Sequence, residues 1–160
     1  MTPVDFSQME CSIARTLETI GDRWALLILR DAFYGVRRFE DFQADLGIAR
    51  NVLTDRLQKL VAREVLRREQ YEARPPRFEY RLTEKGRDLL PVILTMMRWG
   101  DRWTSEGGEA PVTLTHVTCG HETEPVVCCS HCGGELTRRE LRVHPIRIHG
   151  PRREEALAES

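Results

Sequence analysis

The sequence predicts an α+β fold that is mainly helical, with a small cysteine-rich segment near its end. Three observations on the 160 residues support this prediction. Apolar residues recur at three- or four-residue spacing in the first part of the chain, as they do in amphipathic helices. Apolar and charged residues then alternate over 78–82, which is typical of a strand with one buried face. Four of the five cysteines lie within residues 119–132 and mark a separate segment.

Two helices open the predicted fold. Ile13, Leu17 and Ile20 have helical spacing, and Gly21 ends this first helix. Asp22 is a suitable N-cap for a second helix, RWALLILRDAFY, because its side chain can accept hydrogen bonds from the first amide groups. The second helix is apolar nearly all round, so we expect it at the buried centre of the domain.

A third and a fourth helix follow closely. The third, FEDFQADL, begins after GVRR and stops at Gly47. Its inward-facing residues are Phe39, Phe42 and Leu46. The fourth lies within IARNVLTDRLQKLV, residues 48–61, and its apolar stripe consists of Leu53, Leu57, Leu60 and Val61. Two short helices joined by a tight turn that contains glycine form a helix-turn-helix.

A two-stranded hairpin is predicted directly after the helix-turn-helix. Phe78, Tyr80 and Leu82 alternate with charged residues in the second strand, and VLRREQY is a weaker match to a first strand. The intervening EARPPR must turn. We assign Pro75 and Pro76 to this loop because proline cannot donate to a strand ladder. A hairpin in this position is the wing of a winged helix-turn-helix.

The helix predicted over 83–103 is expected to pair with a second copy of the chain. Thr83 is its N-cap, and Pro91 is expected to bend it. Its apolar residues on or near one face are Leu89, Val92, Ile93, Met96 and Trp103. This stripe is broader than a small winged domain can cover, so we expect a homodimer through residues 83–104 and the first helix. The alternative is that the helix folds back on its own core.

The sequence divides into four regions. Residues 1–104 form the winged-helix and dimerisation domain, 105–111 (SEGGEAP) a linker, 112–150 a cysteine-rich, zinc-ribbon-like tail with a small β-hairpin, and 151–160 a disordered end. No apolar run is long enough to cross a membrane and no signal peptide is visible, so a cytoplasmic location is expected. The formal net charge is −1, but residues 37–81 hold 11 Lys and Arg against 8 Asp and Glu, a local surplus that suits phosphate binding.

Five fragments of the sequence carry a family resemblance. GDRW, GVRRFEDF, IARNVLTDRLQKL, PPRFEYRLTEKG and WGDRW occur in this order within about residues 11–103. Their order and spacing resemble the HxlR-type winged-helix transcriptional regulators of the MarR-like superfamily. The resemblance implies a small dimeric regulator, a repressor by family likeness, that binds a pseudo-palindromic operator in double-stranded DNA. The long cysteine-bearing tail departs from the family pattern.

The fourth predicted helix carries the residues expected to read DNA. In a winged helix-turn-helix this helix enters the major groove, where Arg pairs with guanine and Asn or Gln with adenine. Its candidate residues are Arg50, Asn51, Thr54, Asp55, Arg56 and Gln58. The alternative is a solvated helix with structural pairs, such as Asp55 with Lys59, and Arg56 can equally brace the fold. Outside this helix the candidates are Arg74 and Arg77 at the wing tip and Arg37 and Arg38 before the third helix.

A single cysteine near the start of the chain is a candidate sensor. Cys11 occupies the position of the family's N-terminal cysteine, so the resemblance implies a thiol that reacts with aldehydes, quinones or oxidants. The exposed N–H groups at the start of a helix favour such reactivity. A small buried side chain without a chemical role is the alternative.

Two fragments of the tail share one pattern. His116-x-x-Cys119-Gly and Cys129-x-x-Cys132-Gly each resemble a zinc knuckle, in which two ligands bracket a tight turn. Together they predict one structural zinc per chain in a Cys₃His site. Either His121 or Cys128 can replace one of these four ligands. A redox dithiol and an unligated tail remain as alternatives.

The predicted function is therefore that of a dimeric, sequence-specific DNA-binding transcriptional regulator that responds to a thiol-reactive signal or a small ligand. No enzyme activity is expected. One alternative is a thiol-redox enzyme or carrier, although no βαβ pattern surrounds the CxxC fragment. Another is a zinc-stabilised module in which the tail and the wing bind a protein partner.

Overall fold

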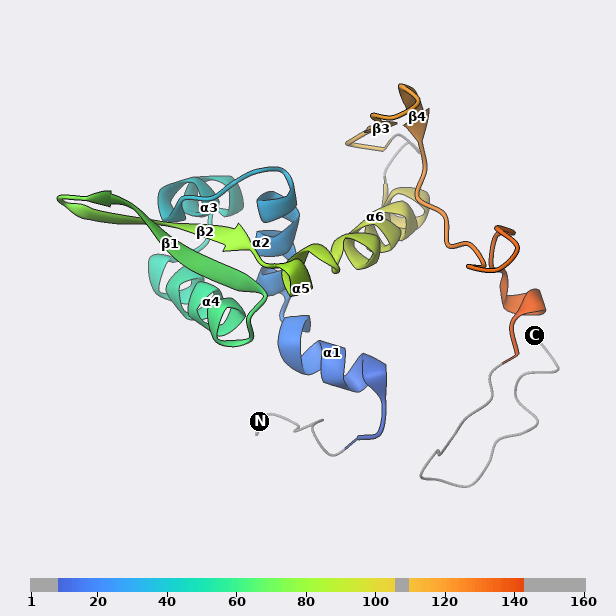
Figure 1. Cartoon of the computed structure of the whole chain (residues 1–160), viewed down its shortest axis with the longest axis horizontal. Coiled ribbons are helices and arrows are strands. Elements are labelled where there is room, and N and C mark those ends of the chain that lie inside the picture. The colour runs from blue at the N-terminus through green and yellow to red at the C-terminus, as the bar shows by residue number, and fades with distance from the viewer. Residues whose placement is uncertain (1–8, 106–109, 143–160) are drawn as a thin grey trace. The chain divides into compact units, whose positions relative to one another are not determined.

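The computed structural model describes residues 9–105 and 110–142 (Figure 1). The chain divides into two units, of which one is Thr19–Val127 and the other combines the residues before Thr19 with those from Cys128 onward. The disordered end predicted at 151–160 and most of the predicted linker lie outside the described residues. Within the described ranges, no helix has the length and apolar character needed to cross a membrane.

The four helices predicted in the first part of the chain are confirmed. They are α1 (Ser12–Ile20), α2 (Arg23–Phe33), α3 (Phe39–Leu46) and α4 (Arg50–Ala62). Asp22 caps α2 as expected, because its Oδ1 accepts a hydrogen bond of 2.9 Å from the Trp24 amide. Gly47 ends α3 with a φ of 59°, a left-handed conformation that favours glycine. Three residues then connect α3 to α4.

The core of the domain lies where α2, α3 and α4 meet. Its largest fully buried side chains are Phe42, Ile28, Leu29, Leu53, Leu57, Leu60, Leu66 and Val65. The α4 leucines recur at the predicted helical spacing, and each truncation of such a residue to alanine costs about 2–5 kcal/mol. Burial of this stripe leaves the polar residues of α4 on the opposite face.

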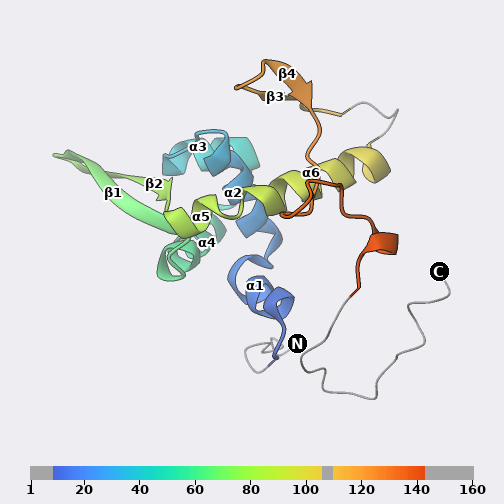
Figure 2. The same ribbon diagram turned by 45° about the vertical axis from the view of Figure 1, so that its right-hand side comes forward.

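The wing is an antiparallel hairpin of β1 (Leu66–Ala73) and β2 (Pro76–Leu82). It extends beyond α3 and α4 in both views (Figures 1 and 2). The assignment of Pro76 to the loop was wrong, because Pro76 is the first residue of β2 and pairs with Ala73. Proline is accepted there because the first residue of a strand need not donate to the ladder. The connecting loop is therefore only Arg74 and Pro75.

The single bent helix expected over 83–103 is two helices, α5 (Glu84–Arg87) and α6 (Leu90–Thr104). Pro91 has no amide hydrogen to donate to the carbonyl of Arg87, and its ring would collide with that carbonyl in a continuous helix. The chain therefore leaves the helix at Asp88 and begins a new one, in which Pro91 occupies the first turn. Thr83 caps α5 as predicted, accepting a hydrogen bond of 3.0 Å from the Gly86 amide.

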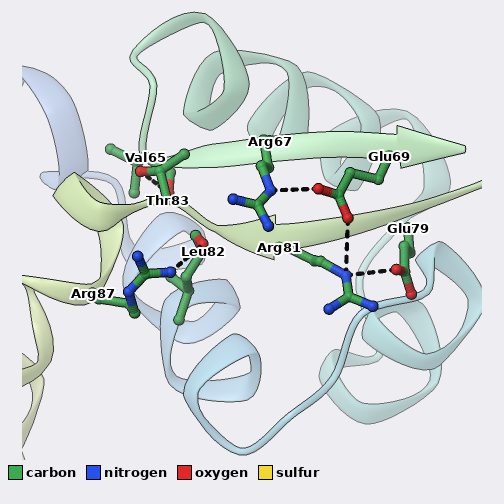
Figure 3. Close-up of polar contacts among 8 residues, drawn as sticks. All are labelled: Val65, Arg67, Glu69, Glu79, Arg81, Leu82, Thr83 and Arg87. Atoms are coloured by element: carbon green, nitrogen blue, oxygen red, sulfur yellow. Dashed lines mark hydrogen bonds and ion pairs between the residues drawn. The ribbon is translucent and has the colours of Figure 1, made fainter.

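The α5 helix is held against the segment that leads into the wing. The Thr83 hydroxyl donates to the Glu64 carbonyl at 2.6 Å. It also lies 3.1 Å from the Val65 carbonyl, and Arg87 donates to the Leu82 carbonyl at 3.2 Å (Figure 3). Gly86 is buried against the same segment. A Cβ at this position would overlap the Val65 carbonyl oxygen and lie 3.1 Å from Leu82 Cδ2. Only glycine allows this close approach.

The apolar residues of α6 occupy two faces rather than one. Leu89, just before the helix, and Ile93 pack against the core. A second row at positions i, i+4, i+7 and i+11 is exposed, and it consists of Val92, Met96, Trp99 and Trp103. Trp99 and Trp103 keep 62% and 65% of their surface accessible. A helix with two apolar faces has more apolar surface than its own domain covers.

The cysteine-rich segment contains little regular structure in its described part. Strands β3 (Leu114–His116) and β4 (His121–Thr123) form a short antiparallel hairpin, and Arg138–Glu140 form a single 3₁₀ turn, η2. The zinc-ribbon-like hairpin predicted for this segment is not confirmed. Because His116 pairs directly with His121, the β3–β4 hairpin closes around the first knuckle fragment alone.

Candidate nucleic-acid interface

The exposed face of α4 carries short polar side chains. Asn51 and Gln58 are exposed, and Thr54 is half-buried with its hydroxyl bonded to the Arg50 carbonyl at 2.8 Å. The Arg50 guanidinium lies over the Phe39 ring at 4.8 Å, so a residue of α3 positions it at the start of α4. These contacts leave the amides of Asn51 and Gln58 available to an external partner.

The N-terminus of α4 is a feature that sequence reasoning missed. Its N-cap is Ala49, which makes no side-chain hydrogen bond to the helix. The first amide groups of α4 therefore receive no capping hydrogen bond from the side chain of residue 49, and uncapped amide groups attract anions at a helix N-terminus. The signal was present in the sequence, because an alanine stands where Ser, Thr, Asp or Asn normally caps a helix.

Arg56 braces the fold. Its Nε lies 2.8 Å from Asp22 Oδ1, which connects α4 to the N-cap residue of α2, and its Nη1 also pairs with Asp55. Asp55 additionally pairs with Lys59 at 2.8 Å, the i, i+4 pair considered as the structural alternative. The hydrogen bond from Lys59 lowers the pKa of Asp55. Burial raises the pKa of Asp22, but hydrogen bonds from Arg56 and the Trp24 amide outweigh it and lower the value.

The outward face of the wing is neutral near its base. Arg67 pairs with Glu69 at 2.6 Å, and Arg81 lies between Glu69 at 3.1 Å and Glu79 at 2.6 Å (Figure 3). Two arginines and two glutamates thus compensate one another. The opposite face of the hairpin is apolar toward the core, where Tyr80 and Leu82 pack.

The wing tip presents positive charge. Arg77 pairs with Glu72 at 3.3 Å, and both side chains remain about half exposed. Arg74 is exposed and has no carboxylate within ion-pair distance in the described part of the chain. The two arginines predicted at the tip therefore differ, since only Arg74 is without an acidic partner there.

Arg37 and Arg38 lie beside the wing. The Arg37 carbonyl accepts a hydrogen bond of 2.8 Å from the Tyr80 amide. The backbone of Arg38 forms an isolated antiparallel β-bridge with that of Glu79 in β2. The Arg38 guanidinium lies 5.0 Å from the centroid of the Tyr71 ring. Tyr71 is an exposed aromatic residue of the wing that sequence reasoning did not single out. Its alternation with Arg68 and Glu69 was too poor to assign it to a face.

The five cysteines are free thiols. Cys11 directly precedes α1, and its carbonyl accepts a hydrogen bond of 3.1 Å from the Arg15 amide, as expected of an N-cap position. Its side chain is half-buried. The structure therefore places Cys11 at the predicted helix start.

The first knuckle fragment forms a tight turn between β3 and β4. The Gly120 amide donates to the His116 carbonyl at 2.8 Å, and Gly120 has a φ of 74°, where glycine is favoured. His116 Nδ1 and Cys119 Sγ are 3.3 Å apart. His121 lies opposite His116 in the strand register. The turn thus brings one imidazole and one thiol together.

The second knuckle fragment repeats this geometry. The Gly133 amide donates to the Cys129 carbonyl at 2.9 Å, and the φ of Gly133 is again 74°. Backbone amides of Cys132 and His131, together with the Cys132 thiol, lower the pKa of the Cys129 thiol. The backbone of the adjacent Cys128 forms an isolated antiparallel β-bridge with that of Glu135. Among the described residues, no three His, Cys, Asp or Glu side chains converge closely enough to hold a metal ion.

Comparison with known proteins gives a consistent picture. The model of the HxlR-like helix-turn-helix family matches residues 19–107. An uncharacterised HTH-type transcriptional regulator of Mycobacterium tuberculosis is 46% identical over 134 residues, which cover 84% of this chain and 85% of that protein. The crystal structure of PA1607, described as a candidate transcription factor, is 37% identical with a TM-score of 0.77 and covers 86% of this chain and 96% of its own. The redox regulator HypR in its oxidised form is 35% identical with a TM-score of 0.56, covering 60% of this chain and 100% of its own.

Proposed function

Because the chain belongs to the HxlR-like helix-turn-helix family, we propose that it is a dimeric, sequence-specific DNA-binding regulator of transcription. The observation that carries this proposal is the exposed polar face of α4 beside a wing that extends past it (Figure 1). The buried leucines of α4 fix which face is turned outward. A helix presented in this way fits the major groove, and a neighbouring hairpin fits the adjacent backbone or minor groove.

The residues of this interface have different roles in the proposal. Asn51 and Gln58 read base edges, because a side-chain amide matches the donor and acceptor of adenine. Arg50 reaches guanine or a phosphate near the uncapped start of α4. The remaining contacts to phosphate come from Arg37, Arg38, Arg74 and Arg77. Asp55 and Arg56 act indirectly, by fixing α4 to α2, and Thr54 lies at the edge of the contact surface.

Binding-site selection from a random DNA pool tests this assignment. Asn51→Ala and Gln58→Ala should change the selected sequence, because they remove base contacts. Arg77→Ala should weaken binding to all sequences and reduce the slope of log affinity against log salt by about one unit. Arg139→Ala, an exposed arginine of η2 outside the proposed DNA and dimer surfaces, is the matched control and should change neither quantity. Unchanged binding by all three interface variants would exclude this face as the DNA contact.

The proposed homodimer uses the second apolar face of α6. Val92, Met96, Trp99 and Trp103 form a continuous exposed row there, and α1 has its own exposed apolar residues. Within α1, Ile13 keeps 72% of its surface accessible. Burial of this apolar surface against a second chain is favourable by about 25 cal/mol per Å² of apolar area. A twofold dimer would present two copies of α4 to half-sites one helical turn apart, which matches a pseudo-palindromic operator.

The proposed signal is a thiol-reactive compound or oxidant that modifies Cys11, with release of DNA and derepression as the outcome. Two observations support this part of the proposal: Cys11 lies at the start of a helix, and a structural neighbour is named as a redox regulator. Operator binding measured before and after diamide treatment, with mass spectrometry of Cys11, tests it. A Cys11→Ser protein that still releases DNA on oxidation would exclude this thiol as the trigger.

We further propose that the two knuckle turns supply the ligands of one structural zinc. The ligand set is His116, Cys119, Cys129 and Cys132, with His121 as the alternative imidazole. Each turn, taken by itself, has two ligand atoms and a glycine in the left-handed conformation. The amides that lower the pKa of Cys129 favour its thiolate, which is the form that binds zinc. An oxidisable dithiol is the rival, and a thiol titration after metal removal separates the two.

A further inference from the structure

A cavity of about 640 Å³ lies between α2, α6 and the residues that follow the linker. Its volume is within the range of small-molecule sites, which is about 300–1,000 Å³. The walls are mostly apolar and include Leu27 of α2, Met97 of α6 and Val112. Leu27 is half-buried and, within the described residues, does not belong to the hydrophobic core cluster, so its side chain forms part of this wall. We call this cavity the α2–α6 pocket.

One buried carboxylate oxygen in the pocket has no partner among the residues that the structure describes. Asp31 is the buried charged residue of the described core, with 3% of its surface accessible, and it lines the pocket. Its Oδ1 accepts a hydrogen bond of 2.8 Å from Arg30 Nε. Its Oδ2 is buried and has no hydrogen-bond partner among the described residues. Buried carboxylate oxygens are nearly always satisfied in folded proteins, so a donor supplied to Asp31 Oδ2 from outside the chain would be favourable.

The charges around the pocket define the kind of donor that fits. Arg30 supplies one positive charge, whereas Asp31 and the exposed Asp45 supply two negative charges. Arg30 is already engaged by Asp31 at 2.7 Å. A ligand with a carboxylate would therefore find no free cation and would leave Oδ2 unsatisfied. A positively charged N–H group both satisfies Oδ2 and balances the second carboxylate.

We propose that the α2–α6 pocket binds a small apolar amine. Its ammonium group donates a charge-assisted hydrogen bond to Asp31 Oδ2, and its hydrocarbon body packs against Leu27, Met97 and Val112. The site is distinct from the α4 face and from Cys11. Binding itself requires neither DNA nor a reactive thiol.

The location of the pocket indicates what binding would do. The α2 helix packs against α4, and the opposite wall belongs to α6, whose exposed row is the proposed dimer face. A ligand between α2 and α6 changes the angle at which α6 leaves the domain and thus the separation of the two α4 helices. This consequence rests on the proposed function, whereas the binding site does not.

Three probes with the same ring system test the chemistry. Binding of 1-naphthylmethylamine, 1-naphthylmethanol and 1-naphthoate to the full chain is measured by calorimetry without DNA. The amine should bind with a dissociation constant of about a millimolar or below, as expected for a ligand of this size. Its affinity should exceed that of the naphthoate at least tenfold, because only the amine offers a charged donor. Equal affinities of the amine and the naphthoate, or no binding of the amine, would overturn the proposal. The second outcome includes the case in which a second chain fills the pocket.

Matched variants assign the effect to the pocket. Asp31→Asn should weaken amine binding about tenfold and leave the alcohol unaffected, since it removes the charge and keeps the shape. Asp41→Asn, an exposed aspartate of α3 outside the pocket, is the control and should bind as the wild type does. Leu27→Trp fills the cavity without entering the core and should abolish amine binding even if Asp31→Asn fails to fold. Wild-type amine affinity in Leu27→Trp, or in folded Asp31→Asn, contradicts the assignment.

A second readout separates this inference from the proposed function. If the amine binds and also changes operator affinity, both stand. If the amine binds as described but no DNA sequence is selected, the pocket stands and the regulator proposal fails. If DNA is bound but none of the probes is, the regulator proposal stands and the pocket assignment fails.

Discussion

Replacement of Gly86 by alanine should destabilise the domain, although the same exchange in most helices is stabilising. Alanine is favoured over glycine by about 1 kcal/mol in an exposed helix, because glycine loses more backbone entropy on folding. At Gly86 the added Cβ would overlap the Val65 carbonyl oxygen and approach Leu82 Cδ2 to 3.1 Å. The overlapping partner is backbone, which cannot rotate away as a flexible side chain does. The helix α5 must therefore move as a whole.

The size of the effect follows from what that movement disrupts. Overpacking at a tightly packed site costs about 1–3 kcal/mol. Displacement of α5 also breaks the Thr83 cap, which accepts from the Gly86 amide and donates to the Glu64 carbonyl, and a lost cap costs about 1 kcal/mol. After the gain in helix propensity is allowed for, the variant should lose about 1–3 kcal/mol of unfolding free energy.

Urea denaturation followed by circular dichroism, at one protein concentration, measures this loss. Gly100→Ala is the matched control, because a Cβ at that helical position meets only Thr104 Oγ1 at an ordinary 3.7 Å. It should be neutral or gain up to about 1 kcal/mol. The two variants are thus expected to differ in sign. A Gly86→Ala protein as stable as the wild type would refute the close packing of α5 on Val65.

Three further predictions concern acid stability, assembly and metal. The pKa of Asp22 is lowered from its ordinary 3.8, so its ion pair with Arg56 stabilises the fold above that pH, and this contribution is lost as the pH falls through the folded value. The free energy of unfolding should therefore decrease less steeply from pH 6 to about 2 in Asp22→Asn than in the wild type. Identical pH profiles would count against the Arg56 brace. Trp99→Ala and Trp103→Ala should each raise the dimer dissociation constant by about 30-fold or more in sedimentation, and a monomeric wild type would contradict the interface. Protein purified without chelator should hold about one zinc per chain, which Cys129→Ser loses and Cys128→Ser retains; less than about 0.2 zinc per chain in the wild type would exclude a structural site.

The parts of the fold that the sequence predicted well are those in which local signals and burial agree. Helices α3 and α4 were predicted because their apolar spacing, the stop at Gly47 and the short turn between them all indicate the same structure. The cap at Asp22 was predictable for the same reason. Pro76 was misassigned because the prediction considered only that proline has no amide hydrogen to donate. It did not consider that the first residue of a strand needs no such donor.

Other features depend on tertiary contacts that sequence patterns do not contain. The break between α5 and α6 requires knowledge that Arg87 ends the first helix, whereas the apolar pattern continues across it. Asp31 is the clearest case, because an aspartate in an apolar helix gives no indication that Oδ1 is paired with Arg30 while Oδ2 has no partner in the described part of the chain. The division of the α6 apolar residues into two faces likewise depends on the packing of Ile93 against the core, which helical spacing alone does not indicate.

The compensated charges on the wing have a consequence for how this protein would search a chromosome. With Arg67, Glu69, Glu79 and Arg81 neutralising one another, the base of the hairpin adds no net charge. In the proposed regulator, the counterions released on approach to a duplex of arbitrary sequence are therefore those displaced by the arginines at the wing tip, before α3 and at the start of α4. Hold on non-target DNA would depend on these few contacts, and distinction of the true site would depend on the amides of Asn51 and Gln58.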